Sequence, residues 1–101
     1  MGKTSIRVSK SFLGWRIMPV LEVVVIDRDT GRPVGYGVNV IVENKGIHQI
    51  AVTDTSGIAR FVLPRGRYVI IAGGGAFDIE KRPVTLDKSK RVRITIRRIL
   101  L

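Results

Sequence analysis

The stretch from residue 53 to residue 71, T-D-T-S-G-I-A-R-F-V-L-P-R-G-R-Y-V-I-I, constrains the fold more than any other part of the chain. Side chains two positions apart on a β-strand share a face. One apolar stripe comprises Ala59, Phe61 and Leu63, and a second comprises Tyr68, Ile70 and Ala72. Pro64 has no backbone donor and Gly66 tolerates a positive φ, which favours a tight turn between the stripes. We therefore predict a β-hairpin that needs further strands to cover its apolar face.

The rest of the chain contains strand patterns separated by turn signals, and no apolar repeat of helical spacing extends over three turns. Besides the two strands of the hairpin, the predicted strands span residues 21–27, 37–44, 48–54, 77–86 and 91–101. Pro83 interrupts one of them and places it at a sheet edge. About seven or eight short strands predict an all-β fold, an antiparallel β-sandwich.

A chain of 101 residues with 45% hydrophobic residues can bury one core but is too short for two full domains. We assign residues 20–101 to the β-sandwich domain and residues 1–19 to a basic N-terminal arm or an extra edge strand. Gly14 and Pro19 separate this arm from the first predicted strand. There is no apolar stretch of the ~20 residues that a transmembrane helix needs, and no secretory leader is recognisable, so we expect a cytoplasmic location.

The formal net charge of +10 is the most unusual property of the composition. A surplus of this size on a small domain attracts nucleic acid, an anionic membrane surface or an acidic protein. The alternative is a basic surface that serves solubility alone. The chain has no cysteine, which excludes disulfides, thiol catalysis and thiolate metal sites. A preference for Arg over Lys and a scarcity of Asn and Gln indicate a thermophilic source.

The best candidate for a binding site is the run R-V-R-I-T-I-R at residues 91–97. Alternation sends the aliphatic side chains inward and lines the cations along the outside, ~7 Å apart, which is close to the spacing of successive phosphates. The predicted polyanion-binding residues are Arg91, Arg93, Arg97, Arg98, Lys88, Lys90, Arg7, Lys10 and Arg16. Alternatively, this cationic stripe is a solvated face that blocks edge aggregation, neutralised by cross-strand acids such as Glu43 or Glu80.

A second candidate surface consists of apolar side chains on a face that should be wet. If Val23, Val25, Tyr68 and Ile70 face the core, their neighbours along the strands face outwards and need a cover. The predicted assembly interface comprises Phe12, Trp15, Val24, Ile26, Val69, Ile71 and Leu100. Either the N-terminal arm covers these residues within the chain, or another chain does.

No convincing catalytic, cofactor or metal-binding constellation occurs in the sequence. The tripeptide G-K-T near the N terminus lacks the earlier glycine and the preceding strand of a phosphate-binding loop. His48 is the single histidine and has no recognisable nucleophile or zinc-ligand partner. The clustered acids Asp27, Asp29 and Asp54 are typical turn formers, and nearby arginines oppose a calcium ion. We therefore predict no cofactor, no metal and no enzymatic activity.

Three segments resemble the carboxypeptidase regulatory-like domain. They are V-V-V-I-D-R-D-T-G-R-P-V-G-Y-G-V-N-V at residues 23–40, T-D-T-S-G at 53–57 and L-P-R-G-R-Y-V-I-I at 63–71. The resemblance covers about residues 21–99 and implies a transthyretin-like, prealbumin-type β-sandwich. Such domains are mostly accessory modules, so the resemblance is specific for fold and says little about function. The transthyretin-like group includes hydroxyisourate hydrolases, but this chain lacks their several histidines and their Tyr-Arg-Gly-Ser ending.

These observations predict a small, basic, non-catalytic binding or assembly protein that contacts a polyanion, with RNA or DNA in a larger complex as the expected partner. The alternative is a structural or surface accessory module that self-associates or docks through an exposed apolar face. A homo-oligomer or larger assembly is compatible with both, and no small-molecule substrate is expected.

Overall fold

The computed structural model describes residues 18–99, so most of the predicted N-terminal arm lies outside the described part of the chain. Seven strands are present: β1 (Val20–Asp27), β2 (Asn39–Glu43), β3 (His48–Val52), β4 (Ile58–Val62), β5 (Gly66–Gly74), β6 (Phe77–Leu86) and β7 (Lys90–Ile96). The predicted all-β fold is confirmed. Residues 18–99 contain no helix long and apolar enough to cross a membrane.

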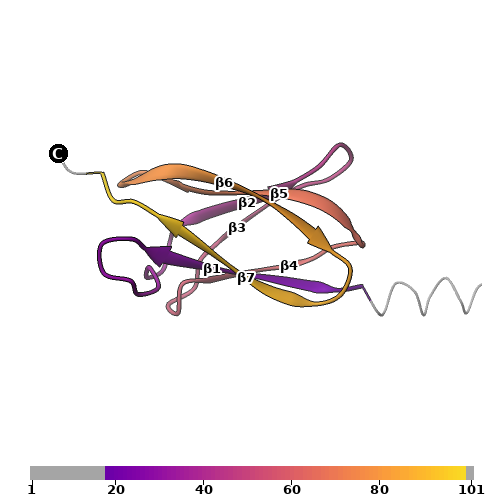
Figure 1. Ribbon diagram of the computed structural model, residues 1–101, viewed down its shortest axis with the longest axis horizontal. Coiled ribbons are helices and arrows are strands. Elements are labelled where there is room, and N and C mark those ends of the chain that lie inside the picture. The colour runs from indigo at the N-terminus through magenta and orange to yellow at the C-terminus, as the bar shows by residue number, and fades with distance from the viewer. Residues whose placement is uncertain (1–17, 100–101) are drawn as a thin grey trace, which may run out of the picture.

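The strands form two sheets that pack face to face (Figure 1). One sheet has three strands in the order β4-β1-β7, and the other has four in the order β3-β2-β5-β6. The described strands pair antiparallel except for β1 and β7, which run parallel. The β-sandwich is therefore confirmed, with one parallel pair that the sequence did not predict. Pro83 lies on the edge strand β6, as predicted.

The predicted hairpin over residues 53–71 is wrong. β4 pairs with β1, whereas β5 pairs with β2 and β6, so the two strands lie in different sheets. Both apolar stripes are buried as predicted, but they belong to opposite sides of the core. In the β4–β5 connection, which passes from one sheet to the other, Leu63 is fully buried. The hydroxyl of Tyr68 donates to the carbonyl of Pro64 in this connection at 2.6 Å. Alternation shows which face of a strand is buried, but not whether two strands pair or stack.

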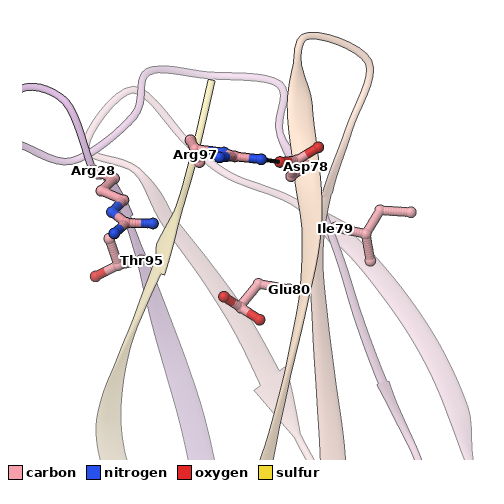
Figure 2. Close-up of a pocket in the computed structure, with 6 residues that line it drawn as sticks. All are labelled: Arg28, Asp78, Ile79, Glu80, Thr95 and Arg97. Carbon is pink, nitrogen blue, oxygen red and sulfur yellow. Dashed lines mark hydrogen bonds and ion pairs between the residues drawn. The ribbon is translucent and has the colours of Figure 1, made fainter. Parts of the chain in front are cut away.

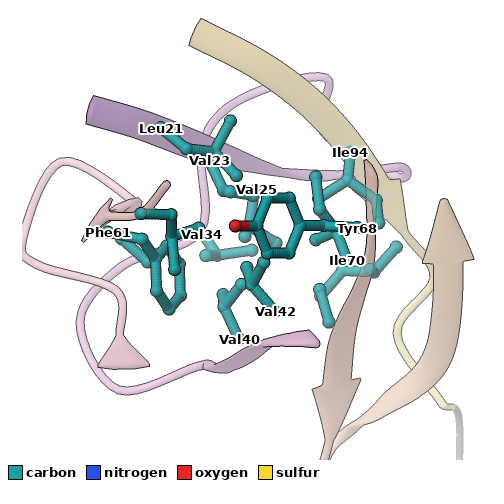
Figure 3. Packing of buried hydrophobic residues seen from close by; sticks show 14 of the residues in the cluster. Leu21, Val23, Val25, Val34, Val40, Val42, Phe61, Tyr68, Ile70 and Ile94 are labelled. Carbon is teal, nitrogen blue, oxygen red and sulfur yellow. The ribbon is translucent and has the colours of Figure 1, made fainter. Parts of the chain in front are cut away.

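Aliphatic side chains from both sheets interdigitate in one core (Figure 3). Its fully buried members include Leu21, Val23, Val25, Val40, Val42, Leu63, Ile70 and Leu86. Burial of one such side chain stabilises the fold by roughly 1.5–3 kcal/mol relative to its exposed state. Ile94 and Ile96 of β7 are buried as predicted, and Val92 is packed against the core while partly exposed.

Thr53 is a polar side chain inside this core, with no solvent exposure. Its Oγ1 donates to the carbonyl of Gly35 at 2.8 Å and accepts from the N–H of Val38 at 3.0 Å. The Thr53 N–H also donates to the Val38 carbonyl at 2.9 Å. The hydroxyl is thus satisfied as donor and acceptor, and it fixes the long β1–β2 connection to the end of β3.

The strand directions separate the connections into two ends of the sandwich (Figure 1). One end holds residues 44–47 between β2 and β3, 63–65 between β4 and β5, 87–89 between β6 and β7, and the start of β1. The opposite end holds residues 28–38, 53–57 and 75–76 and the stretch after β7. Charged turns far apart in the sequence therefore meet at one end or the other.

Replacing Thr53 with Val preserves the volume of the side chain but leaves the Gly35 carbonyl and the Val38 N–H without that partner. We expect the free energy of unfolding to fall by about 1–3 kcal/mol. Urea denaturation followed by circular dichroism measures this change. The exposed Thr55 on the adjacent turn gives the control, because Thr55→Val should change stability by less than about 0.5 kcal/mol. Equal effects of the two substitutions would contradict the role of Thr53.

Candidate functional site

The cationic stripe of residues 91–97 lies on the outside of β7, as predicted, but ion pairs occupy most of it. Nη2 of Arg91 is 2.9 Å from Oε1 of Glu22, and Nη2 of Arg97 is 2.6 Å from Oδ2 of Asp78. Arg93 is exposed and has no acidic partner within residues 18–99. On this strand a phosphate chain would therefore meet one unpaired guanidinium rather than a continuous row.

Arg98, also predicted to bind a polyanion, contacts the folded core instead. Its Nη2 is 3.1 Å from Oδ2 of Asp27, a side chain only 6% exposed, and its guanidinium lies 4.8 Å from the centre of the Phe77 ring. Oδ1 of Asp27 accepts a hydrogen bond from the N–H of Asp29 at 2.8 Å. These two interactions, the backbone one first, lower the pKa of Asp27 although burial opposes the charge.

The acids that neutralise the stripe are not the ones expected. Glu22 on β1 accepts hydrogen bonds from Arg60 at 2.7 Å and from Arg91, and these bonds lower its pKa. Glu43 instead pairs with His48 at 2.9 Å, and Glu80 has no ion pair with any described residue. Neutralisation by neighbouring strands is thus present, but it comes from the three-stranded sheet and from the start of β6.

A cleft of about 410 Å³ opens between β6 and β7 (Figure 2). Its lining residues are Arg28, Asp78, Ile79, Glu80, Thr95 and Arg97. The ion pair between Arg97 and Asp78 bridges the two strands, while Glu80 points into the space between them and Ile79 points away. Because both signs of charge line the cleft, it offers no net attraction to a polyanion.

Five cations, four of them without an ion pair in the described chain, lie instead at the end of the sandwich where β1 begins, and we call this end the basic end. Figure 1 shows the strand ends that meet there. The basic end comprises Lys45, Arg65, Arg67, Lys88 and Lys90. Nδ2 of Asn44 donates to the carbonyl of Arg67 at 3.3 Å, which joins the β2–β3 turn to β5. Nε of Arg65 donates to the carbonyl of Asp87 at 2.9 Å, which joins the β4–β5 connection to the β6–β7 turn. Three separate connections are thereby fixed to one another.

Two acids lie at the basic end: Asp87 in the β6–β7 turn, and Glu43 at the end of β2, which pairs with His48 at 2.9 Å. Nζ of Lys90 lies 3.6 Å from Oδ1 of Asp87, and the pKa of Asp87 is lowered by a backbone hydrogen bond and by this ammonium. The other four cations, Lys45, Arg65, Arg67 and Lys88, have no ion pair within the described part of the chain.

The segment before β1 is attached at the same end. The N–H of Val20 donates to Oγ of Ser89 at 2.9 Å, and the N–H of Leu63 donates to the carbonyl of Pro19 at 3.2 Å. Four cations and no acid precede residue 18 in the sequence. The connectivity thus joins a basic segment to a basic surface.

Lys88 and Lys90 were predicted for the site from the sequence, whereas Lys45, Arg65 and Arg67 were not. Each of the missed cations lies in or next to a tight connection, K-G at residues 45–46 and P-R-G-R at 64–67, and this was the available signal. Their meeting depends on strand order, which no local pattern encodes. The predicted residues Arg7, Lys10, Phe12, Trp15, Arg16 and Leu100 lie outside the described residues.

The predicted assembly interface is not one surface. Val24 and Ile26 lie on the outer side of the three-stranded sheet, where they are buried, at 7% and 5% exposure, rather than exposed as predicted. β1 is the central strand of this sheet, so side chains on both neighbours cover it. Ile58 and Arg93 flank Val24, and Pro33 is bridged to Ile26.

Val69 and Ile71 point outwards on the opposite side of the molecule, as predicted. Val69 is 38% exposed and Ile71 is half-buried. The strand register places Ile71 beside Ile41 and Ile41 beside Ile50, which is 61% exposed. We call this outer side of the four-stranded sheet the open face. It is defined by Ile41, Ile50, Val52, Val69 and Ile71.

The side chains considered for catalysis or metal binding are dispersed. His48 is exposed on β3, and no three potential metal ligands cluster within residues 18–99. Asp27 and Asp54 both act in turns: Oδ1 of Asp54 accepts hydrogen bonds from the N–H groups of Ser56 and Ile58, which lower its pKa.

Solved structures with the same architecture come from unrelated functional classes. The chain is similar to the 5-hydroxyisourate hydrolase of Klebsiella pneumoniae, with 23% identity and a TM-score of 0.63 over 82% of this chain and 88% of that chain. It is also similar to GBS52, the minor pilin of Streptococcus agalactiae, with 20% identity and a TM-score of 0.61 over 82% and 45%. The fold is transthyretin-like.

BcpA, the major pilin subunit of Bacillus cereus, shares this fold at 13% identity and a TM-score of 0.60, over 79% of this chain and 30% of that chain. The chain spans only 16% of another similar structure, the Bacillus anthracis TIE protein. No protein family and no curated protein sequence matches the chain. Identities this low show the fold alone, since one sandwich fold hosts many functions. Membership of the carboxypeptidase regulatory-like group stays a prediction.

The lowered pKa of Asp27 predicts how stability depends on pH. Because the folded-state pKa lies below the ordinary value of 3.8, the Asp27 carboxylate stabilises the fold above about pH 4. This contribution is lost as the pH falls through the folded-state pKa. The difference in unfolding free energy between the wild type and Asp27→Asn should therefore be largest at neutral pH and should shrink in acid, as urea denaturation at several pH values would measure. Asp29→Asn, at an exposed acid without an ion pair in the described chain, should show a smaller difference.

Proposed function

We propose that this protein is a non-catalytic binding module whose basic end contacts the phosphate backbone of RNA or DNA. The observation that carries the proposal is the gathering of Lys45, Arg65, Arg67 and Lys88 without acidic partners in residues 18–99. Because tight connections already fix the backbone at these positions, ordering on binding is restricted to the side chains. Each phosphate that they neutralise also releases counterions from the nucleic acid, which supplies affinity.

The cations at the basic end differ in what they offer a nucleic acid. Lys45 and Lys88 are point charges for single phosphates, whereas Arg65 and Arg67 also provide planar groups that bind phosphate with two donors and stack on bases. The sequence before residue 18 contributes four further cations, Lys3, Arg7, Lys10 and Arg16, and the described part of the chain begins at this end. Backbone contacts of this kind bind with little discrimination between sequences.

The surroundings of the single histidine support a role without catalysis. His48 is exposed on an edge strand, and its Nδ1 bonds to Glu43 at 2.9 Å. No described nucleophile takes part in this pair. The hydrolase that shares the fold is only 23% identical, so its activity does not carry over.

Neutralising the basic end should weaken binding to nucleic acid and make it less dependent on salt. We expect the double variant Arg67→Gln with Lys88→Gln to flatten the plot of log K, where K is the binding constant, against the logarithm of the salt concentration. For duplex DNA, the magnitude of the slope should fall by up to about 0.9 for each phosphate that the variant no longer neutralises. Fluorescence anisotropy with a labelled 20-mer duplex and a 20-mer single strand, at about 50 to 300 mM salt, measures both affinity and slope.

Arg28→Gln with Arg32→Gln is the matched control, because both side chains are exposed at the opposite end and the loss of charge is the same. It should change affinity and slope far less than the basic-end variant. The unpaired Arg93 on β7 gives a third comparison that tests the cationic stripe alone. Equal losses for the two double variants would show that net charge, rather than the basic end, governs binding and would refute the proposal, as would a wild type that binds neither strand at low salt.

A second candidate function is docking as an accessory module through the open face. Exposure of Ile50 at 61% and Val52 at 44% favours it, since clustered apolar side chains on a wet sheet face are typical of interaction surfaces. Two of the similar structures are pilin subunits, which are parts of assemblies by their names.

A further inference from the structure

Within residues 18–99, β3 has an edge whose backbone hydrogen-bonding groups are unused. The strand pairs with β2 on one side and has no other described strand on the opposite side. The N–H of Thr53 donates to Val38, and the carbonyl of Ile47 accepts from Asn44, so the odd-numbered positions bond towards β2. In an antiparallel pair, the backbone groups of the alternate positions point away from the partner. Those positions are His48, Ile50 and Val52.

Other sheet edges of the described chain carry charges or proline, whereas β3 carries neither. The guarding residues are Lys81, Arg82 and Pro83 on β6, Arg91 and Arg93 on β7, and Arg60 on β4. The sequence of β3 is H-Q-I-A-V. Natural sheets use charges and proline to prevent unwanted pairing at their edges, so an unguarded edge with two exposed β-branched residues is an available pairing site.

We propose that β3 strands of two copies of this chain pair antiparallel about a two-fold axis at Ile50, which joins their four-stranded sheets into one continuous sheet. In this register Ile50 faces Ile50 of the partner subunit, and His48 faces Val52 of the partner subunit. The outward groups at these positions then form about six N–H···O=C bonds. In each copy, Ile41 lies beside Ile50 on the outer side of the sheet. The two-fold axis brings Ile50 of the partner subunit against the exposed side of Ile50, which is thereby covered.

The distribution of charge favours a second copy of this chain as the partner that pairs with β3. Two chains of charge +10 repel each other over most of their surfaces, but β3 has no Lys or Arg to oppose its own copy. The register also sets Gly46 opposite Asp54 of the partner subunit. Lys45 of one copy thus lies beside an acidic turn, whose carboxylate is 43% exposed, rather than beside another cation.

β4, which contacts β3 from the other sheet, adds no free cation near the axis. Its exposed Arg60 is already paired with Glu22 at 2.7 Å and with Asp54 at 3.3 Å. Antiparallel pairing also directs the two basic ends to opposite ends of the joined sheet. The dimer therefore leaves Arg65, Arg67 and Lys88 of both basic ends open to a polyanion, whereas Lys45 lies beside the partner subunit.

A charge at the axis tests the pairing, because Ile50→Lys places two ammonium groups against each other at a site that is 61% exposed in one chain. The wild type should have twice the 11.2 kDa mass of one chain, and the variant should have the mass of one chain. Light scattering and sedimentation after nuclease treatment measure the mass without bound polyanion. Wild type and variants are compared at about 0.15 M salt, where the repulsion between ammonium groups is less screened, and at about 1 M salt. Circular dichroism verifies that the variant is folded.

Ile79→Lys on β6 and Val69→Lys on the open face are matched controls that add the same charge at exposed sites away from β3, and both should remain dimeric. The chain has no cysteine, so Ile50→Cys supplies a second measurement. Cα atoms of a hydrogen-bonded antiparallel pair lie about 5.5 Å apart, within disulfide reach, so oxidation should produce a covalent dimer of Ile50→Cys but not of Ile79→Cys.

A wild type that is monomeric at about 1 mM, or an Ile50→Lys variant that stays dimeric, would overturn the proposal. Dissociation of Val69→Lys alone would assign the contact to the open face. Dissociation of all three lysine variants would show general charge repulsion. Each of these results would also overturn pairing through β3. These masses are recorded without nucleic acid, so they do not depend on the proposed function of the basic end.

Discussion

Burial of apolar stripes between two sheets is the constraint that governs the remaining features of this structure. β1 and β7 place Val23, Val25 and Ile94 against Tyr68 and Ile70 of β5, and each stripe is buried only because the other sheet lies across from it. A single sheet of three or four strands would leave one such face in water. Once the sheets stack, the strand directions are fixed, and with them the end of the sandwich at which each turn lies.

The positions of the turns determine where unpaired charge lies on the surface. All eight acids of the chain lie within the described residues. Most of them pair with cations that lie on β4, on β7 or directly after β7, or they cap turns. Exposed ion pairs of this kind contribute little to stability, about 0–1 kcal/mol each. Their larger effect is on where free charge remains. Arginines on β7 are largely compensated, whereas the basic end keeps unpaired cations on three connections that hydrogen bonds hold together.

The two candidate interaction surfaces are distinct and adjoin only at the β2–β3 turn, which carries Lys45. The basic end attracts anions through charge, and its strength depends on ionic strength. The β3 edge offers backbone hydrogen bonds and apolar side chains, which salt screens far less. Guarding charges on β4, β6 and β7 restrict pairing to β3. The proposed contact with a second copy and the proposed contact with a polyanion therefore depend on different forces.

Local sequence patterns were sufficient to predict the strands, their buried faces and the edge position of the strand with Pro83, because alternation and turn residues act over a few neighbouring positions. They also showed the exposed cations of β7. The transthyretin-like class was predicted instead from the resemblance of three segments to a known family. The three-dimensional arrangement was needed to establish that β4 and β5 stack instead of pairing, that Val24 and Ile26 are covered by neighbouring strands, and that Glu22 and Asp78 neutralise Arg91 and Arg97. These outcomes depend on which strands become neighbours, and that choice is made by packing the whole core at once rather than by any local pattern.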